Sequence, residues 1–467
     1  MEGLERFRQQ QNVSFHVPGH KHGELSHLPQ AFKDVMRYDV TELTGLDDLH
    51  NPETMILEAE HLLADTYGAM KSFFLVGGTT VGNLAMIYAT CKKGDRVLVQ
   101  RNAHKSIFHA IELIGAKPVY VSPFWDEQTL TATHISFEHL KEAVDNYPEA
   151  KAVVLTYPTY YGMVSKEIQQ QIAYCHEKRI PVLVDEAHGA HFSACALFQP
   201  SALTYGADVV VQSAHKTLPA MTMASFMHVN SELVDVDKIN HYLRMLQSSS
   251  PSYLLLASLD DARYYVQTYM ESDGAYIIEK KNQWVEALRA IGSLQVIEVD
   301  DPLKLLLRVD GYSGFQLQEA LETKRVYAEL ADAHQVLLIL PLLKHGHIYP
   351  FAEIRVRIKD AVTVLLSTEK TDILTATQTA YNFIAISEPI HTFEEIAHID
   401  KEWLPYMRAM GRIAASMIIP YPPGIPLLVP GEKITVAKLS QLEELLATGA
   451  TFQGNHRLEE KMIEVIK

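Results

Sequence analysis

Cysteine is scarce in this chain of 467 residues. Its three cysteines, Cys91, Cys175 and Cys195, are odd in number and show no Cys-x-x-Cys spacing. This pattern is typical of ordinary thiols in a reducing compartment and does not suggest a disulfide framework.

Long hydrophobic runs are missing as well. The most apolar stretch, residues 336–343, is too short to cross a bilayer. Residues 1–8 are charged and lack the apolar core of a signal peptide. The sequence therefore predicts a cytoplasmic protein.

Positive charge is also in short supply. Lys and Arg number 41 against 57 Asp and Glu, so the formal net charge is −16. Nucleic acids and anionic membranes are bound by basic surfaces, so neither is an expected partner. Hydrophobic residues make up 47% of the chain and charged residues 21%, which predicts a large core rather than disorder.

Short apolar runs alternate with helical patterns between about residues 70 and 230. The runs are continuous, as in strands that helices cover on both faces. We therefore predict an α/β fold with a mostly parallel sheet and a ligand at the carboxyl ends of the strands. The expected strands are residues 72–76, 96–100, 118–121, 152–156, 181–184 and 209–212, with helices over residues 80–91 and 105–115.

The rest of the chain suggests two smaller α+β parts. Helices are expected over residues 251–290, and the later elements are strands at 294–299, 304–309 and 336–340 and helices at 311–324, 393–399 and 403–415. A chain of this length forms two or three domains. We predict a large domain with the N-terminal segment over residues 1–290, a small α+β domain over 291–385 and a C-terminal domain over 386–467.

Two of the expected strands end in residues that suit a pyridoxal 5′-phosphate (PLP) enzyme. One leads into Asp185, and the other leads into Ser213-Ala214-His215-Lys216. A lysine can hold the cofactor aldehyde as a Schiff base, and a carboxylate can keep the pyridine nitrogen protonated so that the ring accepts electrons. The alternative is a surface lysine beside a buried strand.

A glycine-rich turn is the candidate phosphate site. Gly77-Gly78-Thr79-Thr80 follows an apolar strand and opens a helix. The N–H groups of the first helical turn and the threonine hydroxyls could hold a phosphate. An ordinary turn with a threonine helix cap is the alternative. A Walker-type loop is excluded, because no Lys-Ser or Lys-Thr follows the glycines.

Histidines occupy two further candidate positions. His104 follows the strand at residues 96–100 and could lie flat against a cofactor ring, although a helix-start or core histidine is the alternative. Asp185, His188 and His191 could be imagined as metal ligands, but no other cluster at ligand spacing supports a metal, and none is expected. Asp-Glu-Ala-His also matches a helicase motif, which the missing Walker loop disfavours.

Together these motifs resemble the ornithine/lysine/arginine decarboxylase family, PLP enzymes of fold type I with an aspartate aminotransferase-like architecture. The resemblance covers nearly the whole chain. Its most specific elements are Pro18-Gly19-His20-Lys21 and Ser213-Ala214-His215-Lys216. The other matching segments are residues 45–49, 78–80, 101–106, 156–162, 185–188, 247–253 and 421–426.

The resemblance implies a role for each matched residue. Lys216 would carry the cofactor, Asp185 would pair with the pyridine nitrogen, and His104 would stack on the ring. The implied catalytic residues are Lys216, His215, Asp185 and His104. The implied PLP-binding residues are Gly78, Thr79, Thr80, His104, Asp185, Ala187, His188, Ser213, His215, Lys216, Ser249 and Ser250.

The resemblance also implies an assembly. Ser249 and Ser250 stand where family members reach the phosphate of a neighbouring subunit, so a homodimer with its active site at the subunit interface is expected. Many relatives carry an N-terminal wing domain. This chain begins almost at Pro18-Gly19-His20-Lys21, so we expect a dimer or tetramer rather than a large ring.

The expected reaction is decarboxylation of arginine, lysine or ornithine to an amine and CO2, in polyamine biosynthesis or acid tolerance. Asp47, Asp48 and Glu388 are candidate partners for the distal cation, with a surface role as the alternative. Transamination or carbon–sulfur lysis remains open, and Arg355 and Arg357 could then hold a carboxylate unless they are exposed strand residues. A catalytically silent PLP-binding homologue is the third possibility.

Overall fold

The computed structural model describes residues 1–370, 384–421, 424–454 and 456–467. Pro422 and Pro423, in the family-matching segment 421–426, lie outside the described residues. Residues 1–90 and 181–270 form one compact unit, and residues 91–180 and 271–467 form a second. The predicted division at residues 290 and 385 partitions the chain differently and stays a prediction.

The first unit contains four neighbouring strands in the order β1-β9-β8-β7. β7 and β8 pair in parallel, while β9 pairs antiparallel with both β8 and β1. The three strands predicted in this unit are confirmed, and the pairing among its four strands is mixed. β9 is not among the predicted strands, because Ser225 and His228 interrupt its apolar run. The bounds are β1 Lys71–Leu75, β7 Val182–Asp185, β8 Val209–Gln212 and β9 Ser225–Val229.

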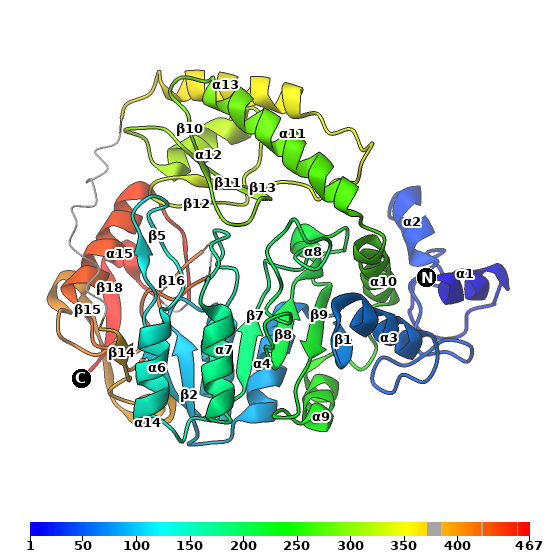
Figure 1. Cartoon of the computed structure of the whole chain (residues 1–467), viewed down its shortest axis with the longest axis horizontal. Coiled ribbons are helices and arrows are strands. Elements are labelled where there is room, and N and C mark those ends of the chain that lie inside the picture. Colours follow the sequence, from blue (N-terminus) through cyan, green and yellow to red (C-terminus); the bar gives the residue numbers. More distant parts are fainter. Residues whose placement is uncertain (371–383, 422–423, 455) are drawn as a thin grey trace. The chain divides into compact units, whose positions relative to one another are not determined.

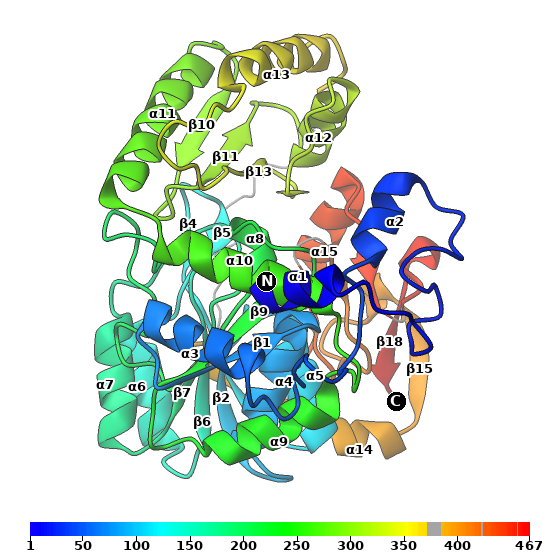
Figure 2. The same ribbon diagram turned by 90° about the vertical axis from the view of Figure 1, so that its right-hand side faces the viewer.

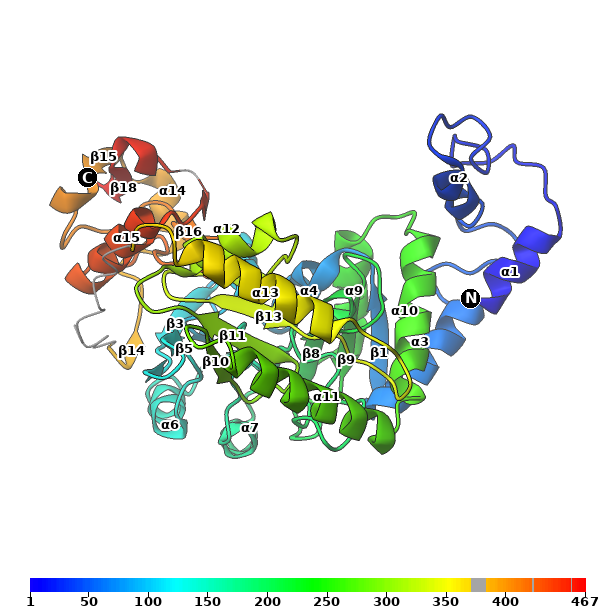
Figure 3. The same cartoon turned by 90° about the horizontal axis from the view of Figure 1, so that it is seen from above.

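Buried apolar side chains hold the helices of this unit against the strands and against one another. α4 packs on β1, β8 and β9, α9 packs on α4, and α3 packs between β1 and α10 (Figure 2). The N-terminal helices α1 and α2 project beyond α3 at the edge of this unit (Figure 3). The bounds are α1 Glu2–Gln9, α2 Gln30–Met36, α3 Met55–Tyr67, α4 Gly78–Thr90, α8 Ala214–Thr217, α9 Val236–Leu246 and α10 Tyr253–Gln267.

The second unit begins with the strand order β6-β2-β3-β14. β6, β2 and β3 are parallel, as predicted, and β14 pairs antiparallel at the edge. α6 and α7 run alongside these strands (Figure 1). The bounds are β2 Arg96–Gln100, β3 Lys117–Val121, β4 Trp125–Asp126, β5 Thr131–Ala132, β6 Ala152–Thr156, β14 Ile386–Ser387, α5 Lys105–Ile114, α6 Phe137–Asn146 and α7 Ile168–Glu177.

A four-stranded antiparallel sheet follows in the same unit, in the order β10-β11-β13-β12. α11 and α12 pack beside this sheet, and α13 packs on these two helices. The expectation that Arg355 and Arg357 lie on a strand is wrong, because they lie on α13. The buried positions of α13, among them Ile358, Ala361 and Leu365, recur at helical spacing. The bounds are β10 Gln295–Glu298, β11 Lys304–Arg308, β12 Leu330–Ala331, β13 Val336–Ile339, α11 Glu271–Arg289, α12 Gly314–Thr323 and α13 Phe351–Leu365.

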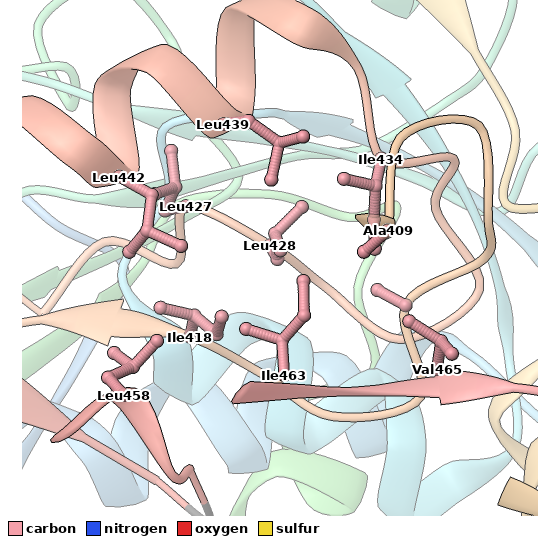
Figure 4. Close-up of a cluster of buried hydrophobic side chains, with 11 residues drawn as sticks. Ala409, Ile418, Leu427, Leu428, Ile434, Leu439, Leu442, Leu458, Ile463 and Val465 are labelled. Carbon is pink, nitrogen blue, oxygen red and sulfur yellow. The ribbon is translucent and has the colours of Figure 1, made fainter. Parts of the chain in front are cut away.

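The C-terminal residues surround a core of their own. Figure 4 shows Leu439 and Leu442 from α15 facing Ile463 and Val465 from β18. The helix predicted over residues 403–415 is wrong, because this segment forms a strand, a 3₁₀ turn and irregular backbone. Pro405 and Gly411 (φ +80°) are incompatible with a continuous helix there. The bounds are α14 Phe393–His398, β15 Lys401–Pro405, η1 Tyr406–Arg408, β16 Ile419–Pro420, α15 Val436–Thr448, β17 Phe452–Gln453, η2 Leu458–Glu460 and β18 Met462–Ile466.

No helix within the described ranges is long and apolar enough to cross a membrane.

One glycine in α4 lets this helix approach the strands closely, and it supplies a test of the packing. A Cβ at position 82 would lie 2.5 Å from Val211 Cγ1 and 2.9 Å from Leu75 Cδ1. We expect Gly82→Ala to lower the free energy of unfolding by about 1–3 kcal/mol, measured by urea unfolding, because the core has no room for the methyl group.

Gly292→Ala is the matched control, since a Cβ there meets nothing within 4 Å. It should leave stability unchanged or slightly raised. Equal losses for the two variants would contradict the close approach of α4.

Candidate active site

The carboxyl end of β7 places Asp185 in the interior of the first unit, where it is 3% exposed. The Asn83 side chain on α4 donates Nδ2–H to Asp185 Oδ2 at 2.9 Å. The backbone N–H of Ala187 donates to Oδ1 at 3.1 Å. The carboxylate is therefore fixed from two directions, by a helix and by its own chain.

Lys216 lies on the short helix α8, directly after β8. Its Nζ lies 2.8 Å from His188 Nε2. An ammonium group can only donate, so His188 Nε2 is the acceptor and can take a proton from the lysine. The pair brings together two of the predicted site residues.

Electrostatics connects Lys216 with Asp185. Burial raises the pKa of Asp185 above its ordinary value, against the lowering effects of the Asn83 amide, the Lys216 charge and the Ala187 N–H. A cation placed against this carboxyl group would favour its ionised form. The site can therefore hold a protonated nitrogen heterocycle better than a neutral one.

The glycine-rich turn lies beside the strand end that carries Ser213. Thr79 Oγ1 and Ser213 Oγ are 3.1 Å apart. Gly78, with φ +74°, begins α4 and donates its N–H to the Met223 carbonyl at 2.9 Å. The α4 N-terminus and two hydroxyls thus converge as expected for an anion site. Thr80 is exposed in the same turn.

His215 is held by the chain that follows it. Its backbone N–H and its Nδ1–H both point to the Ala224 carbonyl, at 3.2 and 3.0 Å. In the neutral ring the proton is therefore on Nδ1, and Nε2 carries the lone pair.

Ser249 and Ser250 are exposed in the first unit. The residue before this serine run, Gln247, accepts the Val76 N–H at 2.8 Å, and the Ser248 carbonyl lies 2.6 Å from His50 Nε2. The serine segment is thus tied to the start of the glycine-rich turn. Its reach to a neighbouring subunit stays a prediction.

His104 belongs to the second unit, so its placement against the cofactor also stays a prediction. It is the N-cap of α5, where Nδ1 accepts the Ser106 N–H. A Cβ on Gly424 would lie 3.2 Å from His104 Nε2, and the Gly424 carbonyl accepts the Lys105 N–H at 3.1 Å. A C-terminal segment therefore packs against this histidine.

A buried ion-pair cluster ties the same segment to the C-terminal residues. Arg101 Nη2 lies 2.7 Å from Glu432 Oε2, and Lys438 Nζ lies 2.7 Å from the same oxygen. Burial would raise the pKa of Glu432, but the charges of Arg101 and Lys438 lower it to about 2. Burial lowers the pKa of Lys438 to about 8. The carboxylate is thus the centre of this cluster.

Two of the acidic candidates for substrate binding have structural contacts instead. Asp47 is buried and accepts backbone N–H groups from Asp48, Glu53, Thr54 and Ile56, at the start of α3. Glu388 accepts the Tyr147 hydroxyl at 2.7 Å and pairs with Arg96. The oxygen atoms of Asp47 are therefore committed to the fold.

The donor set of the first unit fits PLP. It combines a buried carboxylate, a lysine with an adjacent proton acceptor, and a helix N-terminus with hydroxyls. The described part of the chain holds no group of three or more His, Cys, Asp or Glu arranged to bind a metal ion.

The sequence interpretation missed Asn83 as the partner of Asp185. The signal that could have revealed it is its spacing from Thr79. Residues four apart share one helix face, so a helix that directs Thr79 at the phosphate site also directs Asn83 toward it.

Comparison with known proteins places these features in a family. The profile of the Orn/Lys/Arg decarboxylase major domain matches residues 1–302, and that of the Orn/Lys/Arg decarboxylase C-terminal domain matches residues 374–455. The chain belongs to the Orn/Lys/Arg decarboxylase family. The predicted family is therefore confirmed.

Relatives of this decarboxylase-family chain match it along nearly its whole length. The uncharacterized protein YaaO of Bacillus subtilis is 45% identical, over 97% of this chain and 95% of its own. An arginine decarboxylase of the same organism is 32% identical, over 100% of this chain and 97% of its own. The lysine decarboxylase LdcA of Pseudomonas aeruginosa is 26% identical, over 93% and 74%.

Solved structures confirm the α/β fold class. Lysine decarboxylase A from Pseudomonas aeruginosa superposes with a TM-score of 0.81 at 22% identity, covering 99% of this chain and 80% of its own. A Sphingomonas wittichii serine palmitoyltransferase gives a TM-score of 0.52 at 19% identity, covering 66% and 76%.

The Arg101–Glu432–Lys438 cluster provides a pH-dependent test. Removing one partner leaves buried charges unpaired, so we expect Glu432→Gln to lower the free energy of unfolding by about 3–5 kcal/mol at pH 7. The pKa of Glu432 is lowered from 4.5 to about 2 on folding. The loss of unfolding free energy in Glu432→Gln should therefore be full above pH 4.5 and shrink as the pH falls toward 2. Urea unfolding at a series of pH values measures this dependence.

Glu353→Gln is the control, because Glu353 forms an exposed pair with Arg357 on α13. Its effect should be small at every pH. If Glu432→Gln lowered the free energy of unfolding as little as the control does, the buried ion-pair cluster would be contradicted.

Proposed function

We propose that this chain is a PLP-dependent carbon–carbon lyase that decarboxylates a basic amino acid, either arginine, lysine or ornithine. The observation that carries the proposal is the arrangement at the ends of β7 and β8. There a buried, doubly anchored Asp185 lies within the electrostatic influence of Lys216, whose amine contacts His188. Membership of the Orn/Lys/Arg decarboxylase family supports it.

The cofactor would be held by residues from several elements. Lys216 would bind its aldehyde, Asp185 would face its pyridine nitrogen, and His104 would lie against its ring. Gly78, Thr79, Thr80 and Ser213 would hold its phosphate, with Ala187, His188 and His215 beside it and Ser249 and Ser250 reaching a partner subunit. Bound PLP supplies an electron-accepting ring that stabilises the carbanion left when CO2 departs.

The protein side chains manage the protons. His188 Nε2 takes a proton from Lys216 Nζ, which leaves the amine nucleophilic. Asn83 and the Ala187 N–H keep the Asp185 carboxylate aimed in one direction. Protonation at the substrate carbon falls to Lys216 Nζ or His215 Nε2.

Arginine is the first substrate to test. Arginine decarboxylases from Bacillus species match this chain at 31–32% identity, whereas the lysine decarboxylases match at 23–26%. We also propose a cytoplasmic homodimer, as the family resemblance implies.

A substrate panel tests the reaction. PLP-loaded protein should release CO2 and agmatine, cadaverine or putrescine from arginine, lysine or ornithine, detected by product mass. Formation of a keto acid in the presence of a 2-oxo acceptor would show that the reaction is transamination and not decarboxylation. Bound PLP without turnover of any of the three substrates would indicate a silent homologue.

Replacing Lys216 tests the covalent attachment. Borohydride treatment of the PLP-loaded protein should attach the cofactor to residue 216 irreversibly, as read by peptide mass. Lys216→Ala should abolish this attachment and lower activity by several orders of magnitude. Lys238→Ala, an exposed lysine on α9 of the same unit, should change neither. Attachment that survives in Lys216→Ala would assign the linkage to another lysine.

A further inference from the structure

Four buried polar side chains form a continuous row across the first unit. Glu186 Oε1 accepts from Gln212 Nε2 at 2.7 Å, and Gln212 Oε1 lies 3.2 Å from His228 Nε2. His228 Nδ1 lies 2.8 Å from Ser72 Oγ. Each of the four residues is 0% exposed. The row runs from the end of β7 through β8 and β9 to β1.

The direction of each hydrogen bond follows from its neighbours. Gln212 gives its N–H to Glu186, so its oxygen must accept from His228 Nε2–H. The neutral His228 ring then has a lone pair on Nδ1, which accepts the Ser72 hydroxyl. Burial lowers the pKa of His228 to about 3, in agreement with a neutral ring.

The row is anchored at Glu186 and at His228. Glu186 Oε2 accepts the Ala202 N–H at 2.7 Å and the Ser201 hydroxyl at 3.1 Å. Tyr67 from α3 stacks on the His228 ring, with centroids 4.5 Å apart and planes at 25°. The row is therefore attached to structure outside the four strands.

The row and the candidate active site share the same two strand ends. Successive residues of a strand point to opposite faces. Asp185 points toward Asn83 on α4 and Ser213 toward Thr79, while their neighbours Glu186 and Gln212 point away from α4 and contact each other. The Glu186 N–H also donates to the Val211 carbonyl at 2.9 Å. A displacement of the Glu186–Gln212 contact must therefore move Asp185 or Ser213.

Burying polar side chains in a core costs free energy, because each group loses its hydration. Burial raises the pKa of Glu186, while the donors from Ala202, Gln212 and Ser201 favour its ionised form. Apolar side chains of similar volume would avoid the cost of burying this carboxylate. Hydrogen bonds, unlike apolar contacts, have fixed directions and lengths. They can therefore set the register of two strand ends within a few tenths of an ångström.

We propose that the row formed by Glu186, Gln212, His228 and Ser72 is a positioning device for the cofactor site. It fixes the spacing between Asp185 at the end of β7 and the Ser213–Lys216 segment after β8. This inference rests on the proposed function, since it names what the row positions. The four side chains act through the backbone and touch no reacting atom.

Exchanging the first two residues of the row gives a sharp test. In Glu186→Gln the new amide has one oxygen and one NH2 group in place of two oxygens. Its NH2 group must therefore face another donor, either the Ala202 N–H or the Gln212 amide. In Gln212→Glu two carboxyl groups meet. In the double variant Glu186→Gln/Gln212→Glu, the amide at position 186 donates to the carboxylate at position 212 and accepts from Ala202 and Ser201. That carboxylate still accepts from His228, so every hydrogen bond of the row is restored.

The expected result is a non-additive pattern. Each single variant should weaken PLP binding and lower kcat by roughly 10–100-fold, as other supporting residues of a site do. The double exchange should return both values to within about threefold of the wild type. PLP affinity is measured by titrating the cofactor-free protein, and the pH midpoint of the bound cofactor's absorbance should shift in the single variants only.

Leu442→Ala is the control for lost stability, because Leu442 is fully buried in the C-terminal core of the second unit. It should lower the unfolding midpoint without changing the absorbance midpoint. Single variants that bind PLP with wild-type affinity and spectrum would overturn the inference, and so would a double exchange no better than the singles. A wild-type protein that takes up no PLP would overturn the proposed function as well.

Discussion

A carboxylate buried at the end of a strand is the constraint around which the first unit is organised. An ionised Asp185 loses its hydration, so the fold must supply hydrogen bonds in place of water. The Asn83 amide reaches it only because α4 lies close to β8, and that approach depends on Gly82. The geometry of the site is therefore a consequence of how tightly one helix packs on the strands beneath it.

Much of the fold could be predicted from hydrophobic patterns, because strands buried on both faces leave continuous apolar runs. The failures have specific physical causes. β9 escapes prediction since its buried His228 and Ser225 look like surface residues in the sequence. The few residues around Arg355 and Arg357 that suggest a strand are too short a segment to show the helical period of α13. At residues 403–415 the apolar spacing suggests a helix, but Trp403 and Leu404 lie in β15, which pairs with β18, and the chain leaves regular structure after η1.

The candidate site was predictable to the extent that its residues follow strands. The ends of β7 and β8 meet at one edge, so Asp185 and Lys216 could be brought together from sequence alone. The Asn83–Asp185 and Glu186–Gln212 contacts could not be predicted. Only the three-dimensional packing brings these side chains together. Family membership, shown by full-length relatives, supports an amino-acid decarboxylase and leaves the choice of substrate to experiment.

The salt-bridged cluster at Arg101 has a bearing on how this chain can be rearranged. Its guanidinium lies three residues before His104, while its counter-charge, Glu432, comes from far along the sequence. The C-terminal portion is thus no interchangeable module. A chimaera with the C-terminal portion of a relative would need an acid at the position of Glu432, because the buried Arg101 would otherwise lack its counter-charge. It would also need a glycine at position 424, where a Cβ would crowd His104.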